Sequence, residues 1–237
     1  MNVFLPSQFF PPAEAADRRG LIGFGGELTP QWLIDAYRHG IFPWPTQDGA
    51  LAWWSPDPRA VIEFDALHVS QRLTRTMRSG RFHATCDRAF GAVMEGCATA
   101  QDRARATWIT PEVLMAYHRL HRLGVAHSLE VWHAGELAGG VYGVAIGAMF
   151  AAESMFYAAR DASKVALVHL VNHLRARGYQ LLDIQQLTPH TARLGATNIP
   201  RNIFLGRVAE AVDQPVTFGN CLEPVPAAVS DKTESNE

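Results

Sequence analysis

Several features are scarce in this sequence, and each scarcity excludes a class of protein. Only three cysteines occur, Cys86, Cys97 and Cys221, and their spacing fits no metal-ligand pattern. We therefore expect reduced thiols rather than a disulfide framework. No run of 18 apolar residues is present, and the chain does not begin with the basic and apolar regions of a signal peptide. These absences predict a cytoplasmic protein that does not insert into membranes.

Lysine is also scarce, because 19 of the 21 basic residues are arginine. The formal net charge is −2, yet residues 72–122 carry nine arginines against four acids, a local charge of +5. Within them Arg72, Arg75, Arg78 and Arg81 recur at every third residue. Guanidinium groups bind phosphate oxygens in pairs, so this run predicts either a phosphate-binding surface or a solvated helix face. Composition does not choose between the two.

The size of the chain predicts more than one structural unit. Its 237 residues are 48% hydrophobic and 19% charged, which suits a large buried core with a smaller appendage. We place a small N-terminal domain at residues 1–62 and a larger domain at residues 63–222. Residues 223–237 are expected to form a disordered tail.

The stretch from residue 139 to residue 186 organises the larger domain. It begins with apolar residues typical of two strands and then turns abruptly polar at Glu153. Asp161 has the position of an N-cap for a half-buried helix over residues 162–177. A short buried strand is predicted next, over residues 179–184.

Two polar side chains stand out at the end of this last strand. Asp183 and Gln185 are two residues apart, so they are expected on one face of the strand. We expect Glu153 and Asp183 to lie at the ends of strands joined by one helix, where clefts form in α/β folds. The alternative is that Asp183 caps a turn and Glu153 is an ordinary turn charge.

Tryptophans cluster in the first quarter of the chain. Trp44, Trp53 and Trp54 lie within eleven residues, and prolines on both sides of Trp44 stiffen the backbone. This pattern favours a rigid aromatic surface in a loop over packing in a core. A further tryptophan, Trp108, comes just before a predicted helix.

Helix and strand signals fill the remaining chain. Capping residues and apolar periodicity predict helices over residues 30–39, 70–79, 87–98 and 111–123. A strand is predicted at residues 59–64, a β-hairpin at residues 128–144 and a polar loop at residues 100–105. Two histidine pairs, His118 with His121 and His169 with His173, have no carboxylate in a metal-binding pattern, so we expect surface histidines and no metal site.

Several motifs, taken together, are those of a known family. They are FGGELTPQWLIDAYRHGIFPW, WWSPDPRAV, TWITPEV, GGVYGVAIG, ESMF, DASKVAL, and LLDIQ followed by TPHTARLGA. They run in this order over about residues 20–205, and FPW, WWSPDPR and ESMF are the most specific. In this set the chain resembles the leucyl/phenylalanyl-tRNA protein transferase family.

The resemblance implies a fold and an activity. Members have an α/β (α+β) fold, an acetyltransferase-like (GNAT) mixed sheet with flanking helices, beside a small N-terminal domain. They move leucine or phenylalanine, and less so methionine, from charged tRNA to the N-terminal arginine or lysine of a protein, which marks that protein for degradation. Because an aminoacyl ester is already activated, no metal, cofactor or covalent intermediate is required.

The resemblance also implies roles for individual residues. Trp44 and Trp108 would hold the terminal adenosine, and Glu153 would receive the basic end of the acceptor. Asp183 and Gln185 would serve the chemistry, with Asp183 taking the amine proton directly or through Gln185. Met155 would line the pocket for the donor side chain. The helix pattern, rather than the resemblance, adds the expectation that Leu167, Leu170 or Leu174 also lines this pocket. The arginine run likewise adds the expectation that Arg72, Arg75 and Arg78 contact the phosphates of tRNA.

The chain departs from the family pattern at one motif. It reads AAESMFY where the family usually shows GESMFS. Ala152 therefore adds a methyl group and Tyr157 an aromatic ring near Glu153. Both changes bear on the shape of the acceptor mouth.

Two other functions compete with this reading. An acyl-CoA-dependent N-acyltransferase would need a glycine-rich turn that offers backbone N–H groups to a pyrophosphate, and residues 154–163 contain no glycine. A non-catalytic reader of basic N-termini or of RNA would explain Glu153 and the tryptophans. It would not explain a buried Asp183 beside Gln185.

Overall fold

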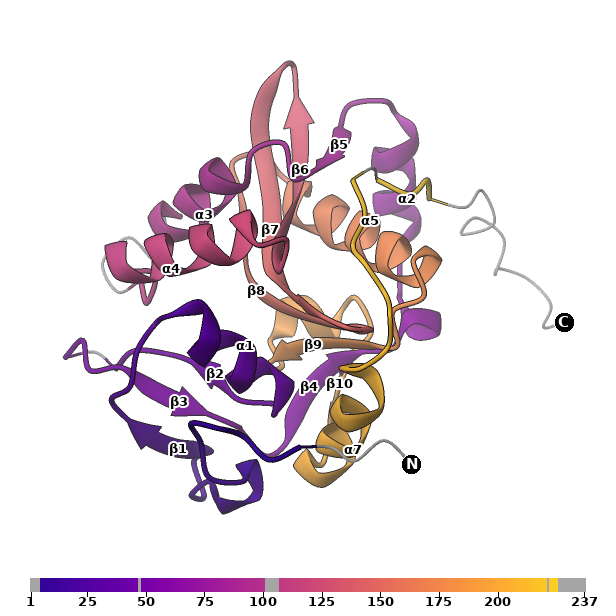
Figure 1. Cartoon of the computed structure of the whole chain (residues 1–237). Coiled ribbons are helices and arrows are strands. Elements are labelled where there is room, and N and C mark those ends of the chain that lie inside the picture. The colour runs from indigo at the N-terminus through magenta and orange to yellow at the C-terminus, as the bar shows by residue number, and fades with distance from the viewer. Residues whose placement is uncertain (1–4, 47, 101–106, 221, 226–237) are drawn as a thin grey trace, which may run out of the picture.

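The structure is a computed structural model, and it describes residues 5–46, 48–100, 107–220 and 222–225. Most of the predicted tail, and the predicted polar loop at residues 100–105 apart from its first residue, lie outside the described residues. The helices and strands form two sheets, one small and one large (Figure 1).

The small sheet lies in the N-terminal part of the chain. It consists of β1 (Leu21–Phe24), β3 (Ala52–Trp54) and β2 (Phe42–Pro43), in that order and antiparallel. Helix α1 (Pro30–Arg38) begins as predicted, because Thr29 Oγ1 accepts the Trp32 N–H and proline occupies the first turn. Gly40 follows the helix at φ +71°, a conformation that favours glycine, and a Cβ there would also meet Leu205 at 2.6 Å.

The large sheet has seven strands in the order β10-β4-β9-β8-β7-β6-β5. Their bounds are β4 (Arg59–Ile62), β5 (His83–Cys86), β6 (Ala126–His133), β7 (Glu136–Ile146), β8 (Met149–Tyr157), β9 (Leu181–Gln185) and β10 (Ala196–Ile199). Neighbouring strands are antiparallel except β8 and β9, which are parallel. Helix α5 (Ala162–Ala176) makes the crossover that a parallel pair requires.

Helices cover both faces of the large sheet (Figure 1). On one face α1, α3 (Phe90–Thr99) and α4 (Pro111–Arg122) pack against β6, β7 and β8. On the other face lie α5 and α2 (Gln71–Arg78). The other helices in the described residues are α6 (Pro189–Ala192), α7 (Arg201–Ala211) and two short 3-10 helices, Ala13–Ala15 and Phe64–Ala66. The predicted mixed sheet with flanking helices is confirmed. The domain boundary at residue 62 stays a prediction, and β4, just before it, is a strand of the large sheet.

Two local predictions are wrong in detail. His173 is wholly buried rather than on the surface, and its Nε2 lies 2.9 Å from the Phe218 carbonyl oxygen. Burial lowers its pKa. Asp161 precedes α5 as predicted, but its side chain makes no capping bond. It instead pairs with Arg72 and Lys164.

Within the described ranges, no helix combines the length and apolar character needed to cross a bilayer.

Candidate active site

An irregularity in the pairing of β7 and β8 places Glu153. Tyr142 lies opposite Ser154 and Gly143 lies opposite Ala152, so Glu153 is the extra residue of a β-bulge. Bulges re-aim side chains and are common beside active sites. Glu153 therefore lies inside a strand, and the prediction that it would stand at a strand end is wrong.

A second irregularity lies in β9. Val61 is opposite Asp183 and Ala60 is opposite Gln185, which leaves Ile184 as the extra residue. Gln185 has φ 56°, a left-handed conformation that costs energy for a residue other than glycine. Its backbone N–H donates to Asp183 Oδ1 at 2.9 Å, which helps to hold that conformation.

The two irregular strands meet at Gln185 and Glu153. Pairing between β8 and β9 ends at Ala151 and Asp183, and the strands part beyond that point. Gln185 Nε2 spans the gap and donates to Glu153 Oε1 at 2.8 Å. The structure thus brings together Glu153, Asp183 and Gln185, which the sequence singled out separately.

Asp183 is buried in an ion pair that sequence reasoning missed. Its side chain is 1% exposed, and Arg59 donates to both oxygens, from Nε to Oδ1 at 2.8 Å and from Nη2 to Oδ2 at 2.6 Å. The Arg59 Nη1 donates to the Gly40 carbonyl at 3.1 Å, and the guanidinium lies 4.7 Å and 4.4 Å from the ring centroids of Phe42 and Phe204. A carboxylate in an apolar strand signals that a cation must be nearby, but not which arginine supplies it.

Glu153 has neutral hydrogen-bond partners instead of a cation. Tyr117 OH donates to Glu153 Oε2 at 3.2 Å, and the Tyr37 and Tyr117 hydroxyl oxygens are 2.5 Å apart. Burial raises the pKa of Glu153 to about 8, and the nearby charge of Asp183 acts in the same direction. Both tyrosines were missed, because each lies at a core-facing position of a helix that looks purely structural in sequence.

The tryptophans divide between surface and core. Trp44 is 38% exposed, and its ring centroid lies 5.9 Å from that of half-buried Trp108, which in turn is 6.5 Å from Tyr117. These two rings lead from the surface to the tyrosine pair. Trp53 is 2% exposed and packs against Phe10, so its predicted place in a loop platform is wrong.

The three leucines predicted to line the donor pocket are core residues instead. Leu167, Leu170 and Leu174 are at most 1% exposed and belong to the core between the sheet and α5. Met155 is half-buried and packs against the same core. Of these four residues, only Met155 presents surface to a ligand.

The arginine run lies on α2, as predicted, but its members differ. Arg72 donates to both oxygens of Asp161, at 2.9 Å and 3.0 Å, and so links α2 to α5. Arg75 and Arg78 are exposed. No group of three metal-binding side chains occurs among the residues that the structure describes.

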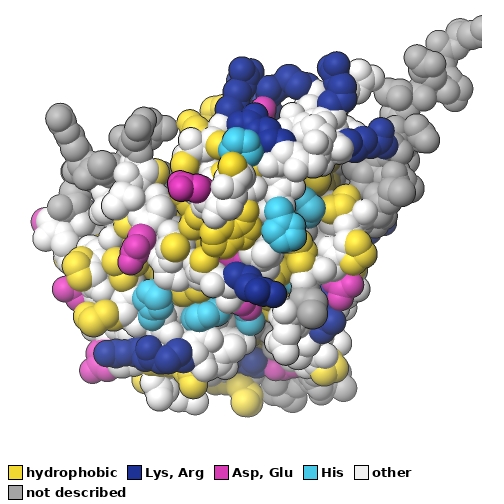
Figure 2. Space-filling model, turned by 90° about the horizontal axis from the view of Figure 1, so that it is seen from above, with side chains coloured by type: hydrophobic (Ala, Val, Ile, Leu, Met, Phe, Trp, Pro, Cys, Tyr) yellow, Lys and Arg dark blue, Asp and Glu magenta, His cyan; other side chains and the backbone are white. Residues whose placement is uncertain are grey.

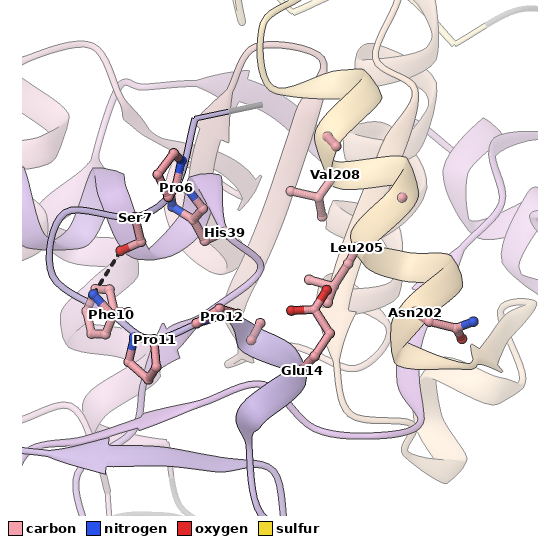
Figure 3. Close-up of a pocket in the computed structure, with 13 residues that line it drawn as sticks. Pro6, Ser7, Phe10, Pro11, Pro12, Glu14, His39, Asn202, Leu205 and Val208 are labelled. Atoms are coloured by element: carbon pink, nitrogen blue, oxygen red, sulfur yellow. Dashed lines mark hydrogen bonds between the residues drawn. The ribbon is translucent and has the colours of Figure 1, made fainter. Parts of the chain in front are cut away.

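A cavity of about 400 Å³ lies elsewhere, between the N-terminal segment and α7 (Figure 3). Phe10, Pro11 and Pro12 line one side of it, and Leu205 and Val208 line the other. None of the predicted site residues lines this cavity.

Solved acetyltransferase structures show limited similarity to this chain. A GCN5-related N-acetyltransferase from Kribbella flavida aligns with 73% of this chain and 61% of its own, at 12% identity and a TM-score of 0.39. A ribosomal-protein-alanine N-acetyltransferase from Brucella melitensis aligns with 47% of this chain and 85% of its own, at 16% identity and a TM-score of 0.33.

Sequence relatives are much closer. A leucyl/phenylalanyl-tRNA--protein transferase of Magnetococcus marinus is 50% identical over 215 residues, which cover 89% of this chain and 91% of the relative. The one of Stutzerimonas stutzeri is 50% identical over 208 residues, 87% of this chain and 92% of the relative. The profile of leucyl/phenylalanyl-tRNA protein transferases matches residues 61–209, and that of their N-terminal domain matches residues 26–57. The chain therefore belongs to the leucyl/phenylalanyl-tRNA protein transferase family and is an aminoacyltransferase.

Proposed function

We propose that this enzyme transfers leucine or phenylalanine from charged tRNA to the N-terminal arginine or lysine of an acceptor protein, at the cluster of Glu153, Gln185 and Asp183. The observation that carries the proposal is the state of Glu153. It is a partly buried carboxyl group with a raised pKa, and within the described part of the chain it forms no ion pair. Such a group is poised to receive a cation.

The energetics favour a basic acceptor. A pKa of about 8 in place of the ordinary 4.5 means that ionised Glu153 is disfavoured by about 5 kcal/mol at most. A guanidinium or ammonium group beside the carboxylate offsets that cost, whereas a neutral side chain does not. The site therefore selects acceptors by the charge of their first side chain.

Asp183 acts through Gln185. Because Arg59 and the Gln185 N–H occupy its oxygens and the side chain is buried, Asp183 is a poor direct proton acceptor. It instead fixes Gln185 in its left-handed conformation, with Nε2 on Glu153. The amide oxygen of Gln185 is then available to accept an N–H of the acceptor's α-amine and to direct its lone pair at the ester.

The reaction needs positioning more than acid–base strength. The α-amine has a free pKa of roughly 7.7 to 8.0, so a large fraction is neutral near pH 8. Its nitrogen forms a bond to the ester carbonyl carbon, the bond from that carbon to the 3′ oxygen of tRNA breaks, and the amine proton ends on that oxygen. No oxidant or cofactor enters this balance.

The donor end is held by rings and arginines. Stacking of the terminal adenine on Trp44 and Trp108 contributes about 1 to 3 kcal/mol per base. Arg75 and Arg78 contact tRNA phosphates. The aminoacyl side chain lies beside Met155, which is half-buried. Since charged tRNA is the donor, we also infer that the enzyme works in the cytoplasm.

An acyl-CoA donor fits this chain less well. In that reaction a pyrophosphate would lie at the N-terminus of α5. The Asp161 carboxylate precedes this helix and is engaged with Arg72 and Lys164. Residues 154–163, which lead into α5, also contain no glycine, so this turn lacks the glycine-rich backbone that would offer N–H groups to a pyrophosphate.

One transfer assay tests the proposal. Radiolabelled leucyl-tRNA is mixed with peptides that begin with arginine, lysine or alanine, and with an N-acetylated arginine peptide. We expect transfer to the first two, little to the alanine peptide and none to the acetylated one. Equal transfer to the arginine and alanine peptides would contradict the role of Glu153, and an absence of transfer to every peptide would contradict the function.

A further inference from the structure

A polar hollow lies at the far end of the large sheet from the acids. It has a volume of about 560 Å³ and opens between β5 and the turn that joins β6 to β7. Arg81, His83, Arg88, Thr85 and Trp132 contribute to its lining. Figure 2 views the end of the molecule at which that turn lies. Arginine and lysine side chains gather along one edge of this end of the molecule.

The charge of the hollow is not neutralised by the side chains around it. Within the described part of the chain, Arg81 and Arg88 form no ion pair, and Arg81 lies 4.9 Å from the ring centroid of Phe82. Two neighbouring acids, Glu130 and Asp87, are engaged with other side chains. Glu130 is fully buried, where it accepts hydrogen bonds from Thr85 and Ser128, Asp87 pairs with His127 at 2.7 Å, and Glu136 is exposed beyond the turn.

An aromatic ring is fixed next to these guanidinium groups. Trp132 Nε1 donates to Thr85 Oγ1 at 2.8 Å, and Thr85 Oγ1 donates to buried Glu130 at 2.5 Å. This chain of hydrogen bonds holds the half-buried indole in place. A fixed ring beside unpaired guanidinium groups matches a nucleotide, whose base stacks and whose phosphate binds arginine.

The position of the hollow suits a polynucleotide that already reaches the active site. Gly80, which contributes to the lining, follows α2 by two residues, so the hollow continues the exposed surface of Arg75 and Arg78. Gly135, in the turn before β7, is eight residues from Gly143 opposite the Glu153 bulge, which corresponds to roughly 27 Å at 3.4 Å per residue. That span is several nucleotides long.

We propose that the hollow formed by Arg81, His83, Arg88 and Trp132 binds a nucleotide of the tRNA remote from its aminoacylated end. The phosphate lies between Arg81 and Arg88, and the base or ribose lies against Trp132. This proposal rests on the proposed function and adds a second contact region for the same substrate.

Two variants and two donors test it. Binding of uncharged tRNA is measured over a range of salt concentrations for Arg88→Ala and Trp132→Ala. We expect Arg88→Ala to weaken binding roughly tenfold and to lower the salt slope by about 0.7 to 0.9. Trp132→Ala should weaken binding about five- to 100-fold with the slope unchanged, and Trp132→Phe should retain most of the affinity. Arg122→Ala, the same charge loss on α4 near the opposite end of β6, is the matched control.

Transfer from a donor without a tRNA body separates this role from a structural one. With 3′-O-phenylalanyl-adenosine as donor, Arg88→Ala and Trp132→Ala should work as fast as the unsubstituted enzyme. If the variants keep the tRNA affinity and salt slope of the unsubstituted enzyme, the proposal is overturned. An equal loss of transfer rate with both donors would overturn it as well. If the unsubstituted enzyme transfers from neither donor, the proposed function is refuted. The tRNA-binding measurement would then still decide whether the hollow binds tRNA.

Discussion

Glu153 is the residue at which burial and charge conflict. Its carboxyl group is surrounded by the Gln185 amide and two tyrosine hydroxyls, which stabilise a negative charge less than a cation would. Under the proposed function, a basic acceptor beside Glu153 would resolve this conflict. Ala152 adjoins the bulge, whereas Tyr157 lies at the end of β8 opposite Gly139, four residues beyond Glu153, and is 59% exposed.

Removing the charge of Glu153 should impair selection more than chemistry. Glu153→Gln keeps the shape but loses a charge-assisted bond, typically about 1.5 to 3 kcal/mol. We expect kcat/KM for an arginine-starting peptide to fall roughly 10- to 100-fold. A neutral amine acceptor serves as the control and should change far less. If kcat/KM falls equally for both acceptors, Glu153 serves chemistry or folding rather than selection.

The same substitution should alter how stability depends on pH. The folded pKa of about 8 lies above the ordinary value of 4.5, so the unfolded chain releases this proton at lower pH than the folded chain does. The contribution of Glu153 to stability is therefore complete below about pH 4.5 and declines until about pH 8.

Urea unfolding at pH 5 and pH 8.5 measures this effect. Relative to the unsubstituted protein, Glu153→Gln should be more stable at pH 8.5 than at pH 5, by up to a few kcal/mol. A stability difference that does not change with pH would show that the carboxyl group is not held in its neutral form.

At the scale of elements, irregular strands do the positioning. The bulges in β8 and β9 turn Glu153 and Gln185 out of the regular alternation, and the Asp183 side chain holds the second irregularity. Glycines in β7 make room for the helices on either face, since a Cβ at Gly139 would meet Ala162 and one at Gly140 would meet Val93.

Asp183→Asn tests the positioning role of β9. The substitution keeps an acceptor for the Gln185 N–H but leaves Arg59 buried without a counter-ion, which costs about 3 to 5 kcal/mol of stability. In protein confirmed as folded by circular dichroism, we expect transfer to fall about 100-fold or more and tRNA affinity to change little. Turnover close to normal would remove Asp183 from the mechanism.

Helix α2 provides a separate test of tRNA binding. Replacing Arg75 and Arg78 with alanine should weaken tRNA binding and reduce its salt slope by about 0.9 for each lost phosphate contact. Arg72 is a poor choice for this test, because it also links α2 to α5 through Asp161. A salt slope equal to that of the unsubstituted enzyme would mean that these arginines are only a solvated face.

At the scale of the whole molecule, Arg59 joins three parts of the chain. Its guanidinium contacts the Gly40 carbonyl and Phe42 from the small sheet region, Phe204 from α7, and Asp183 from β9. The N-terminal part thus helps to support the Arg59–Asp183 ion pair, and it also contains Trp44.

Arg59→Lys should separate this support from simple folding. Lysine keeps the charge but not the bidentate geometry, so we expect kcat to fall about tenfold or more with KM for tRNA nearly unchanged. Arg207→Lys is the matched control, since Arg207 forms a comparable bidentate pair with Glu63 at the surface. A loss of kcat in both variants would point to stability alone.

Local chemistry made much of the fold predictable from the sequence. Thr29 before Pro30 and Thr110 before Pro111 start α1 and α4, because a capping hydroxyl needs only a backbone N–H three residues ahead. The helix from Ala162 and the strand that contains Asp183 likewise follow from short apolar patterns. Tryptophan patterns were less informative, since Trp44 and Trp53 belong to one cluster in the sequence but only Trp53 is buried.

What the sequence determined by itself was the family, the helices α1 to α5 with several strands of the large sheet, and the choice of Glu153, Asp183 and Gln185 as candidate site residues. Only the tertiary structure decided what these residues contact. The partner of Asp183 is 124 residues away, and Tyr37 reaches Tyr117 across 80 residues. Bulges arise from the register of two paired strands, so no single segment encodes them. Contacts of this kind depend on which distant segments the fold brings together, and local periodicity carries no information about that.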